Sequence, residues 1–362
     1  MRHLLKLCAV TTALLMLSPL AFAGFIVGTW NVKHLGWGEH KQYDQVAHVA
    51  QHMDLIAVQE VMSEEGLEAL MSSLERISGE QWGVMASHAI GRGSYRESYA
   101  FLWRESKVEY SGGAVVFLDH NDVFSREPFI AKFQSLQTGQ EVALANIHIL
   151  YGDSVGERLP EIKAMDDIWE WMAEVYPGTP RIIAGDFNLK PSHPGWEELT
   201  HKGVEPSIRR GATTLSTHDG RYANLYDNLW RSPGQLNVTD RGIIRFPELL
   251  GISHEVARKT VSDHAPVYIA LGDAKLQLTA FDGMTITQAQ TKTAANDGNY
   301  DCIDLNNASQ KELEDLPHIG PKRAQAIAEQ GPWSDAASLQ RIRGIGPSRV
   351  QDIQDSGMIC QS

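Results

Sequence analysis

The octapeptide RIIAGDFN, residues 181–188, is an apolar run that ends in polar side chains. Its first residues have the apolar, β-branched character of a buried strand. Alternation along a strand places Asp186 and Asn188 on one face. The octapeptide therefore predicts a buried strand that presents a carboxylate and an amide at its carboxyl end.

Similar apolar runs recur along the first three quarters of the chain, at residues 25–32, 54–61, 99–103, 142–149 and 266–271. Between them, residues 41–53, 64–77 and 161–175 carry apolar side chains at helical spacing. Helices that alternate with strands cover the faces of sheets. The pattern predicts an α/β (α+β) fold with a layered core.

Polar residues also mark the ends of other predicted strands. Asn31 and Glu60 close the first two, and Asp263 with His264 opens the last. Taken singly, Glu60 could equally cap a helix, and a histidine such as His148 at a strand end is usually structural. Oxygen ligands without a cysteine or histidine cluster favour Mg²⁺, Ca²⁺ or Mn²⁺ over Zn²⁺.

The first 23 residues have the features of a secretory signal peptide. Arg2 and Lys6 precede an apolar run at residues 7–17, and residues 21–23 read Ala-Phe-Ala. This run is too short to span a bilayer and no later stretch comes closer, so we expect an exported protein, secreted or periplasmic, without a membrane partner. Removing two basic residues changes the formal charge from −13 to −15. Contact with a nucleic acid must then depend on metal ions and local basic patches.

The length of 362 residues predicts more than one domain. The composition changes from strand-like apolar runs to a polar stretch and then to short helical segments, which predicts two domains after the signal peptide. We expect the first at residues 24–272, a polar linker at 273–300 and a small helical domain at 301–362. Within the latter, Ser309 and Glu312 form a capping box for a helix through Leu316. Cys302 and Cys360 bracket this domain, and an even number of cysteines in an exported protein favours a disulfide between them.

Six short motifs occur in this order: TWN (29–31), QE (59–60), IH (147–148), GDFN (185–188), YDN (226–228) and SDH (262–264). This set resembles the endonuclease/exonuclease/phosphatase superfamily over residues 25–270. GRGSYRESYAFLW (91–103) and SREP (125–128) are similar to its deoxyribonuclease I branch. The resemblance implies a two-sheet sandwich flanked by helices, with the active site at one edge.

The resemblance also implies roles for the motif residues. Glu60 would hold a divalent cation, Mg²⁺ or else Mn²⁺ or Ca²⁺. Further ligands or water-orienting groups would be Asn31, Asp186, Asn188 and Asp263. His264, oriented by Asp227, would act as the general base, and His148, oriented by Glu97, as the general acid.

By the same resemblance, Tyr95 and Arg126 would line a DNA groove and contact phosphate. The second domain resembles the tandem helix-hairpin-helix module of bacterial DNA-uptake receptors, on the repeated fragments LPHIGPKRA (316–324) and IRGIGPSRV (342–350). Gly320 and Gly346 would let the backbone approach a phosphate closely. Positive charge would come from Lys322, Arg323 and Arg349. The alternative for this domain is a small helical protein-docking module.

Together these features predict an exported, metal-dependent deoxyribonuclease with little sequence preference, expected to be endonucleolytic. We expect a monomer whose partner is DNA, with no protein partner evident. One alternative is a sphingomyelinase-like or inositol phosphate phosphodiesterase of the same fold; another is a DNA-capture protein on an inactive scaffold. The segment from Tyr95 to Glu97 and the helix-hairpin-helix region favour DNA over the other phosphodiesters.

Overall fold

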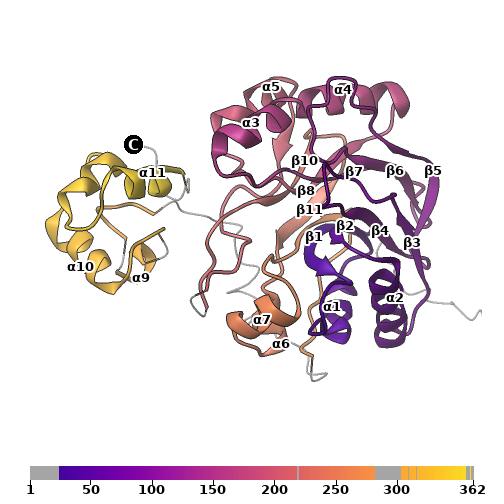
Figure 1. Ribbon diagram of the computed structural model, residues 1–362, viewed down its shortest axis with the longest axis horizontal. Helices are drawn as coiled ribbons and strands as arrows, with labels where there is room; N and C mark the ends of the chain where they lie inside the picture. Colours follow the sequence, from indigo (N-terminus) through magenta and orange to yellow (C-terminus); the bar gives the residue numbers. More distant parts are fainter. Residues whose placement is uncertain are drawn as a thin grey trace, which may run out of the picture.

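The computed structural model describes residues 24–217, 220–281, 303–308, 310–314, 316–355 and 359. The predicted signal peptide at residues 1–23, both cysteines of the second domain and most of the predicted linker lie outside them. In the first domain, two six-stranded sheets pack face to face (Figure 1). The first sheet contains, in spatial order, β11 (Val238–Ile243), β12 (Val267–Leu271), β1 (Ile26–Leu35), β2 (Leu55–Val61), β4 (Ser98–Arg104) and β3 (Trp82–Ala86). The second contains β5 (Val108–Val116), β6 (Phe129–Ser135), β7 (Glu141–His148), β8 (Arg181–Asp186), β10 (Asp227–Arg231) and β9 (Glu205–Pro206).

Each sheet has one parallel pair of strands near its middle, β1 with β2 and β7 with β8, and antiparallel neighbours on both sides. In these pairs Asn31 lies opposite Gln59, and His148 lies opposite Asp186. Parallel strands end at the same edge of a sheet. The topology therefore brings the polar carboxyl ends of all four strands to one edge of the sandwich.

Helices cover the outer faces of both sheets (Figure 1). The first sheet is covered by α1 (Tyr43–Ala50), α2 (Glu64–Ser78), α6 (Phe246–Leu250) and α7 (His254–Thr260). The second is covered by α3 (Val155–Lys163), α4 (Met165–Val175), the 3₁₀ turn η1 (Pro194–Trp196) and α5 (Glu197–His201). Helix α2 is capped at its start by Ser63, whose side chain accepts a hydrogen bond from the Gly66 amide, and at its end by Gly79 with φ of 69°.

The predicted α/β sandwich is confirmed, with differences in detail. The segment 161–175 forms two helices rather than one, because the chain leaves helical geometry at Ala164 between α3 and α4. Strands β3, β5, β6, β9, β10 and β11 were not predicted from the sequence. Strand β5 is an edge strand with exposed and half-exposed side chains and two glycines, Gly112 and Gly113. In the buried strand β6, Lys132 and Gln134 interrupt the apolar run. An edge strand lacks the strong apolar signal of a buried one.

The segment after β12 also packs on the first domain. Leu278 is buried, and Thr279 is held by two histidines of the first helical region: His48 Nε2 lies 2.7 Å from its carbonyl oxygen, and its amide donates to His52 Nε2 at 3.0 Å. The predicted linker from residue 273 thus begins with an ordered, packed segment. Across the described ranges, no helix combines the length and apolar character needed to cross a membrane.

The second domain has its own apolar core, which includes Leu313, Ile327, Leu339 and Ile353. Its helical elements are α9 (Gln310–Leu313), α10 (Pro321–Gln330), the 3₁₀ helix η2 (Ala336–Arg341) and α11 (Pro347–Asp355). Helix α9 is shorter than the predicted one, which ran to Leu316. Both α10 and α11 begin at the proline of a Gly-Pro step, as the sequence repeat suggested.

Cys302 and Cys360 lie outside the described residues, so their disulfide stays a prediction. Their sequence neighbours Ile303 and Ile359 form an isolated parallel bridge. A closed loop of about 60 residues stabilises a fold by roughly 4 kcal/mol in the chain-entropy model. We expect alkylation of the mature protein without reductant to leave its mass unchanged, and reduction to lower the melting temperature of the second domain. Two alkylated thiols before reduction would contradict the pairing.

Candidate active site

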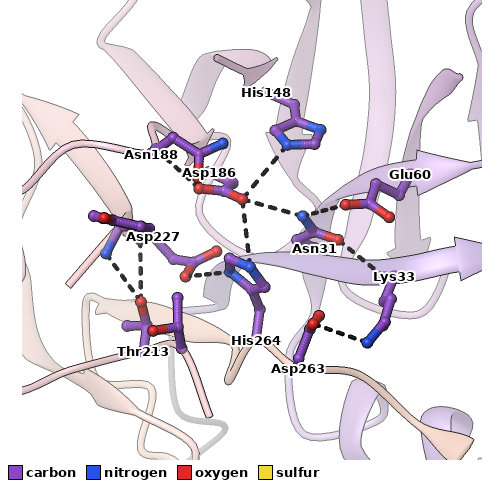
Figure 2. Close-up of polar contacts among 12 residues, drawn as sticks. Asn31, Lys33, Glu60, His148, Asp186, Asn188, Thr213, Asp227, Asp263 and His264 are labelled. Atoms are coloured by element: carbon purple, nitrogen blue, oxygen red, sulfur yellow. Dashed lines mark hydrogen bonds and ion pairs between the residues drawn. The ribbon is translucent and has the colours of Figure 1, made fainter. Parts of the chain in front are cut away.

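Asn31, at the end of β1, joins the two sheets at the edge where the strand ends meet. Its Nδ2 donates to Glu60 Oε1 at 2.9 Å and to Asp186 Oδ2 at 3.1 Å, while its Oδ1 accepts from the Lys33 amide at 2.9 Å (Figure 2). The amide therefore bridges a carboxylate from each sheet. This geometry makes Asn31 an orienting group for Glu60 and Asp186.

Asp186 occupies the centre of the site. Gly185, directly before it, has φ of 155°, and a Cβ there would lie 1.8 Å from the carbonyl oxygen of Ile147 on β7. Only glycine lets β8 pack this closely beside β7. The Nε2 atoms of His148 and His264 each lie 3.6 Å from Asp186 Oδ2 (Figure 2). Two imidazoles from opposite sheets thus converge on one carboxylate oxygen.

Each of these histidines is oriented by a buried carboxylate on its other nitrogen. His148 Nδ1 donates to Glu97 Oε1 at 2.7 Å, and His264 Nδ1 donates to Asp227 Oδ2 at 2.9 Å. These hydrogen bonds leave both Nε2 atoms directed at the centre of the site. The structure therefore contains two histidine–carboxylate pairs, which are the parts needed to accept one proton and to donate another.

Electrostatics favour the charged form of both imidazoles. Burial lowers the pKa of His264, but the carboxylates of Asp227 and Asp186 outweigh it and raise the pKa to about 10. Burial also opposes protonation of His148, and Glu97 is the main group that raises its pKa above the ordinary value. The pKa of Glu97 is lowered: burial acts to raise it, but His148 and Arg126 outweigh that effect.

The backbone around the site is strained. Lys33, His34, Glu60 and Asn188 all have positive φ, between 48° and 60°. Such conformations cost about 1–3 kcal/mol each for non-glycine residues and gather at functional sites. At Asn188, the backbone amide donates to Asp186 Oδ1 at 3.0 Å. The strained turn after Asp186 therefore fixes the orientation of its carboxylate.

Lys41, which is partly buried, fixes the strained turn formed by Lys33 and His34 at the end of β1. Lys41 Nζ donates to the carbonyl oxygens of Val32, Lys33 and Val261, at 2.7, 2.6 and 2.8 Å. Burial lowers its pKa to about 8, partly offset by Glu60. Lys41 thereby joins the end of β1 to the turn that carries His264.

A polar network beneath the site was missed in the sequence. Gln59 Nε2 donates to Asn146 Oδ1 at 2.7 Å, and Asn146 Nδ2 donates to the carbonyls of Val58 and Ala100 at 3.0 Å. These contacts cross between the sheets. Similarly, the Tyr99 hydroxyl accepts from the His148 amide at 2.9 Å. One feature of the sequence could have indicated this network, namely Asn146 as the single amide within the apolar run 142–149.

The remaining residues proposed from the sequence lie in varied settings. The Asp263 carboxylate pairs with Lys33 Nζ at 2.8 Å, beside rather than within the group around Asp186 (Figure 2). Arg126 is buried and donates twice to the carbonyl oxygen of His148, so it acts there as a positioning group. Tyr95 is partly exposed, and its hydroxyl donates to Glu97 Oε2 at 3.1 Å.

In the second domain the two hairpins repeat one contact. Arg323 donates to the carbonyl of His318 and Arg349 to that of Gly344, in each case across the Gly-Pro turn. The arginines thus brace the turns. Gly320 and Gly346 have open space where a Cβ would lie, which leaves the backbone at both turns accessible. Lys322 is exposed.

The donor set fits a hard divalent cation. Glu60 and Asp186 present oxygen atoms side by side through Asn31, and single ligand atoms of Asp186, Asp227 and His264 lie within 4.8 Å of one another. Carboxylate oxygens of this kind suit Mg²⁺, Mn²⁺ or Ca²⁺.

This fold and site agree with the comparison to known proteins. Residues 28–264 match the Endonuclease/Exonuclease/phosphatase family and residues 298–356 match the Helix-hairpin-helix motif. The chain therefore belongs to the endonuclease/exonuclease/phosphatase family and carries a helix-hairpin-helix motif on the C-terminal side of the family domain. The resemblance inferred from the six sequence motifs is confirmed.

Three known proteins show how similar this chain is to its relatives. The chain is 46% identical over 370 residues to a protein named deoxyribonuclease from Thioalkalivibrio sp. (strain K90mix), an alignment that covers 99% of each. Deoxyribonuclease-1 of Bos taurus is 26% identical over 245 residues, 62% of this chain and 83% of its own. The structure of a mannosyl-6-phosphatase from Bacteroides thetaiotaomicron VPI-5482 matches with a TM-score of 0.51 at 17% identity, covering 68% of this chain and 99% of its own. The last likeness shows the shared fold alone.

Proposed function

We propose that this protein is an exported, divalent-cation-dependent endodeoxyribonuclease that hydrolyses DNA with little sequence preference. The observation that carries the proposal is the convergence of two histidine–carboxylate pairs on Asp186, beside Glu60. The 46% identity to a deoxyribonuclease along nearly the whole chain supports DNA as the substrate. Export rests on the signal-peptide features of residues 1–23.

In the proposed reaction, water attacks the phosphorus atom and the bond to one ester oxygen breaks. His264 Nε2 accepts the proton of the attacking water, and His148 Nε2 donates a proton to the leaving oxygen. Asp227 and Glu97 keep both imidazoles in the required orientation. A divalent cation held by Glu60 and Asp186 would neutralise charge on the phosphoryl oxygens. Asp227 and, to a smaller extent, Asp186 raise the pKa of His264, so neutralising the Asp186 carboxylate would favour the neutral imidazole that a base needs.

The function is tested by incubating the mature protein with closed circular plasmid, RNA and sphingomyelin, each with Mg²⁺, Mn²⁺, Ca²⁺ or a chelator. Conversion of closed circles to nicked circles, dependent on a divalent cation, is the expected result. Release of phosphocholine from sphingomyelin with intact plasmid would instead support the alternative phosphodiesterase. Fractionation of the source cells should place the mature protein outside the cytoplasm.

We further propose that the second domain holds the DNA backbone and raises the concentration of substrate at the active site. The open backbone at Gly320 and Gly346, at the starts of α10 and α11, supports phosphate contact through helix N-terminal amides. A module of this kind contacts the backbone and distinguishes sequences little.

Replacing both glycines with glutamate in the full-length protein tests this role. Neither glycine has a left-handed φ and a Cβ meets nothing at either, so we expect the domain to stay folded while the carboxylates repel phosphate. KM for long DNA should rise several-fold at low salt, and this difference from wild type should shrink as salt increases. The matched control, Gln330→Glu with Gln340→Glu, adds the same charge at exposed positions away from the turns. Equal KM values for the two double variants would contradict phosphate contact at these turns.

A further inference from the structure

Three aromatic rings form an exposed cluster beside the candidate active site. His34 and Trp37 have ring centroids 5.5 Å apart, and Trp37 and Tyr95 have centroids 5.9 Å apart with their planes at 89°. Trp37 is 49% exposed and Tyr95 36%. We call these three residues the aromatic corner, because its two largest rings meet at a right angle.

The aromatic corner is hydrogen-bonded both to Glu60, the proposed cation ligand, and to Glu97, which orients His148. The His34 amide donates to Glu60 Oε2 at 2.9 Å, and its ring Nε2 lies 3.4 Å from the same oxygen. On the other side, the Tyr95 hydroxyl donates to Glu97, the carboxylate that orients His148. A ligand on these rings would therefore lie next to the group being cleaved.

The loop that carries Trp37 is held in place. The Trp37 amide donates to the His34 carbonyl at 3.0 Å, and Gly36 and Gly38 adopt φ of 94° and 81°. Gly36 packs against the first turn of α2, where a Cβ on Gly66 would lie 2.4 Å from the Gly36 Cα. A large aromatic side chain on a fixed loop gives contact area at low entropic cost.

Resting on the proposed function, we propose that the aromatic corner is a subsite for one unpaired nucleobase adjacent to the cleaved phosphodiester, with Trp37 as its stacking surface. A nucleobase is flat, so it can lay its face on one ring and direct its edge at the perpendicular ring, as aromatic groups favour. Base faces inside a duplex are covered by their neighbours. The occupant is thus a base from single-stranded DNA, and the enzyme cleaves single strands as well as duplexes.

The test uses the full-length protein and two single-stranded oligonucleotides with the same backbone, one with normal bases and one abasic around the cleaved bond. Wild type should cleave the base-containing strand about tenfold more efficiently in kcat/KM, the size expected of one base–aromatic stack. Trp37→Ala should lose this preference and Trp37→Phe should keep most of it. Leu136→Ala, which truncates another half-exposed apolar side chain, should behave as wild type.

The ratio of kcat/KM on the base-containing single strand to kcat/KM on a matched duplex should fall in Trp37→Ala and stay within about twofold of wild type in Trp37→Phe and Leu136→Ala. A Trp37→Ala protein that still prefers the base-containing strand would overturn the stacking role. Equal losses on single strand and duplex would overturn it as well, since they would show that Trp37 supports the site in general rather than an unpaired base. If wild type cleaves no DNA of any kind, the proposed function itself fails, and the inference fails with it.

Discussion

Replacing His264 with alanine should lower the rate of plasmid nicking by at least about 100-fold, with the loss in kcat rather than in KM. General acid–base groups typically contribute 10²- to 10⁴-fold. His264 is the imidazole that Asp227 aligns on Asp186, and its side chain is 13% exposed and lies among polar groups rather than in the apolar core. The measurement is the initial rate at saturating plasmid and saturating Mg²⁺.

A folding defect must be separated from a loss of chemistry, because truncation removes the partner of the buried Asp227. His264→Gln keeps a polar amide at that place, and its melting temperature should stay close to that of wild type while activity is lost. His201→Ala is the matched control: this histidine is 73% exposed and pairs only weakly with Glu197 on α5. Near-normal nicking by a folded His264 variant would refute its role as the base.

Removing divalent cations should abolish cleavage, and Glu60→Gln should raise the Mg²⁺ concentration needed for half-maximal activity by about 10- to 100-fold. In the wild type, Asn31 donates to one carboxylate oxygen of Glu60 and the His34 amide donates to the other. The single amide oxygen of glutamine can keep one of these hydrogen bonds, so the size of the side chain is retained while the charge is lost. Activity should recover in part at high Mg²⁺. The measurement is the initial rate against Mg²⁺ concentration after treatment with chelator.

Thermal unfolding gives a readout of the same site without catalysis. A cation that binds the folded state raises the melting temperature, and this rise should be smaller in Glu60→Gln than in wild type at equal Mg²⁺. Glu68→Gln, on the exposed face of α2, removes the same charge and should leave both measurements unchanged. Full activity in the presence of chelator, or an unaltered Mg²⁺ requirement in Glu60→Gln, would contradict the cation site.

Much of the fold could be predicted from local patterns. Buried strands such as those in 54–61 and 181–188 can be recognised by their apolar runs, because both of their faces are covered. The hairpins of the second domain were visible as a repeated Gly-Pro step. Edge strands such as β5 and the break between α3 and α4 could not be predicted in this way, since exposure and packing, rather than local pattern, decide them.

Some residues of the candidate site could likewise be predicted from local patterns, whereas others could not. The apolar runs predicted that Asp186 and His148 lie at the ends of strands. The partners of the two histidines came from family resemblance instead, because Glu97 is 51 positions from His148 and Asp227 is 37 positions from His264. Only the folded sandwich showed that Asn31 contacts both Glu60, 29 positions away, and Asp186, 155 positions away.

Local patterns predicted the apolar strands β1, β2, β4, β7, β8 and β12 and the polar residues at several of their ends, because both depend on residues adjacent along the chain. The buried strands β6 and β10 were not predicted. The tertiary structure alone decided that Asn146 links the sheets beneath the site and that Trp37 meets Tyr95 at a right angle. Such contacts join residues far apart in the chain. Their geometry depends on how the two sheets and their loops pack, and no local periodicity encodes it.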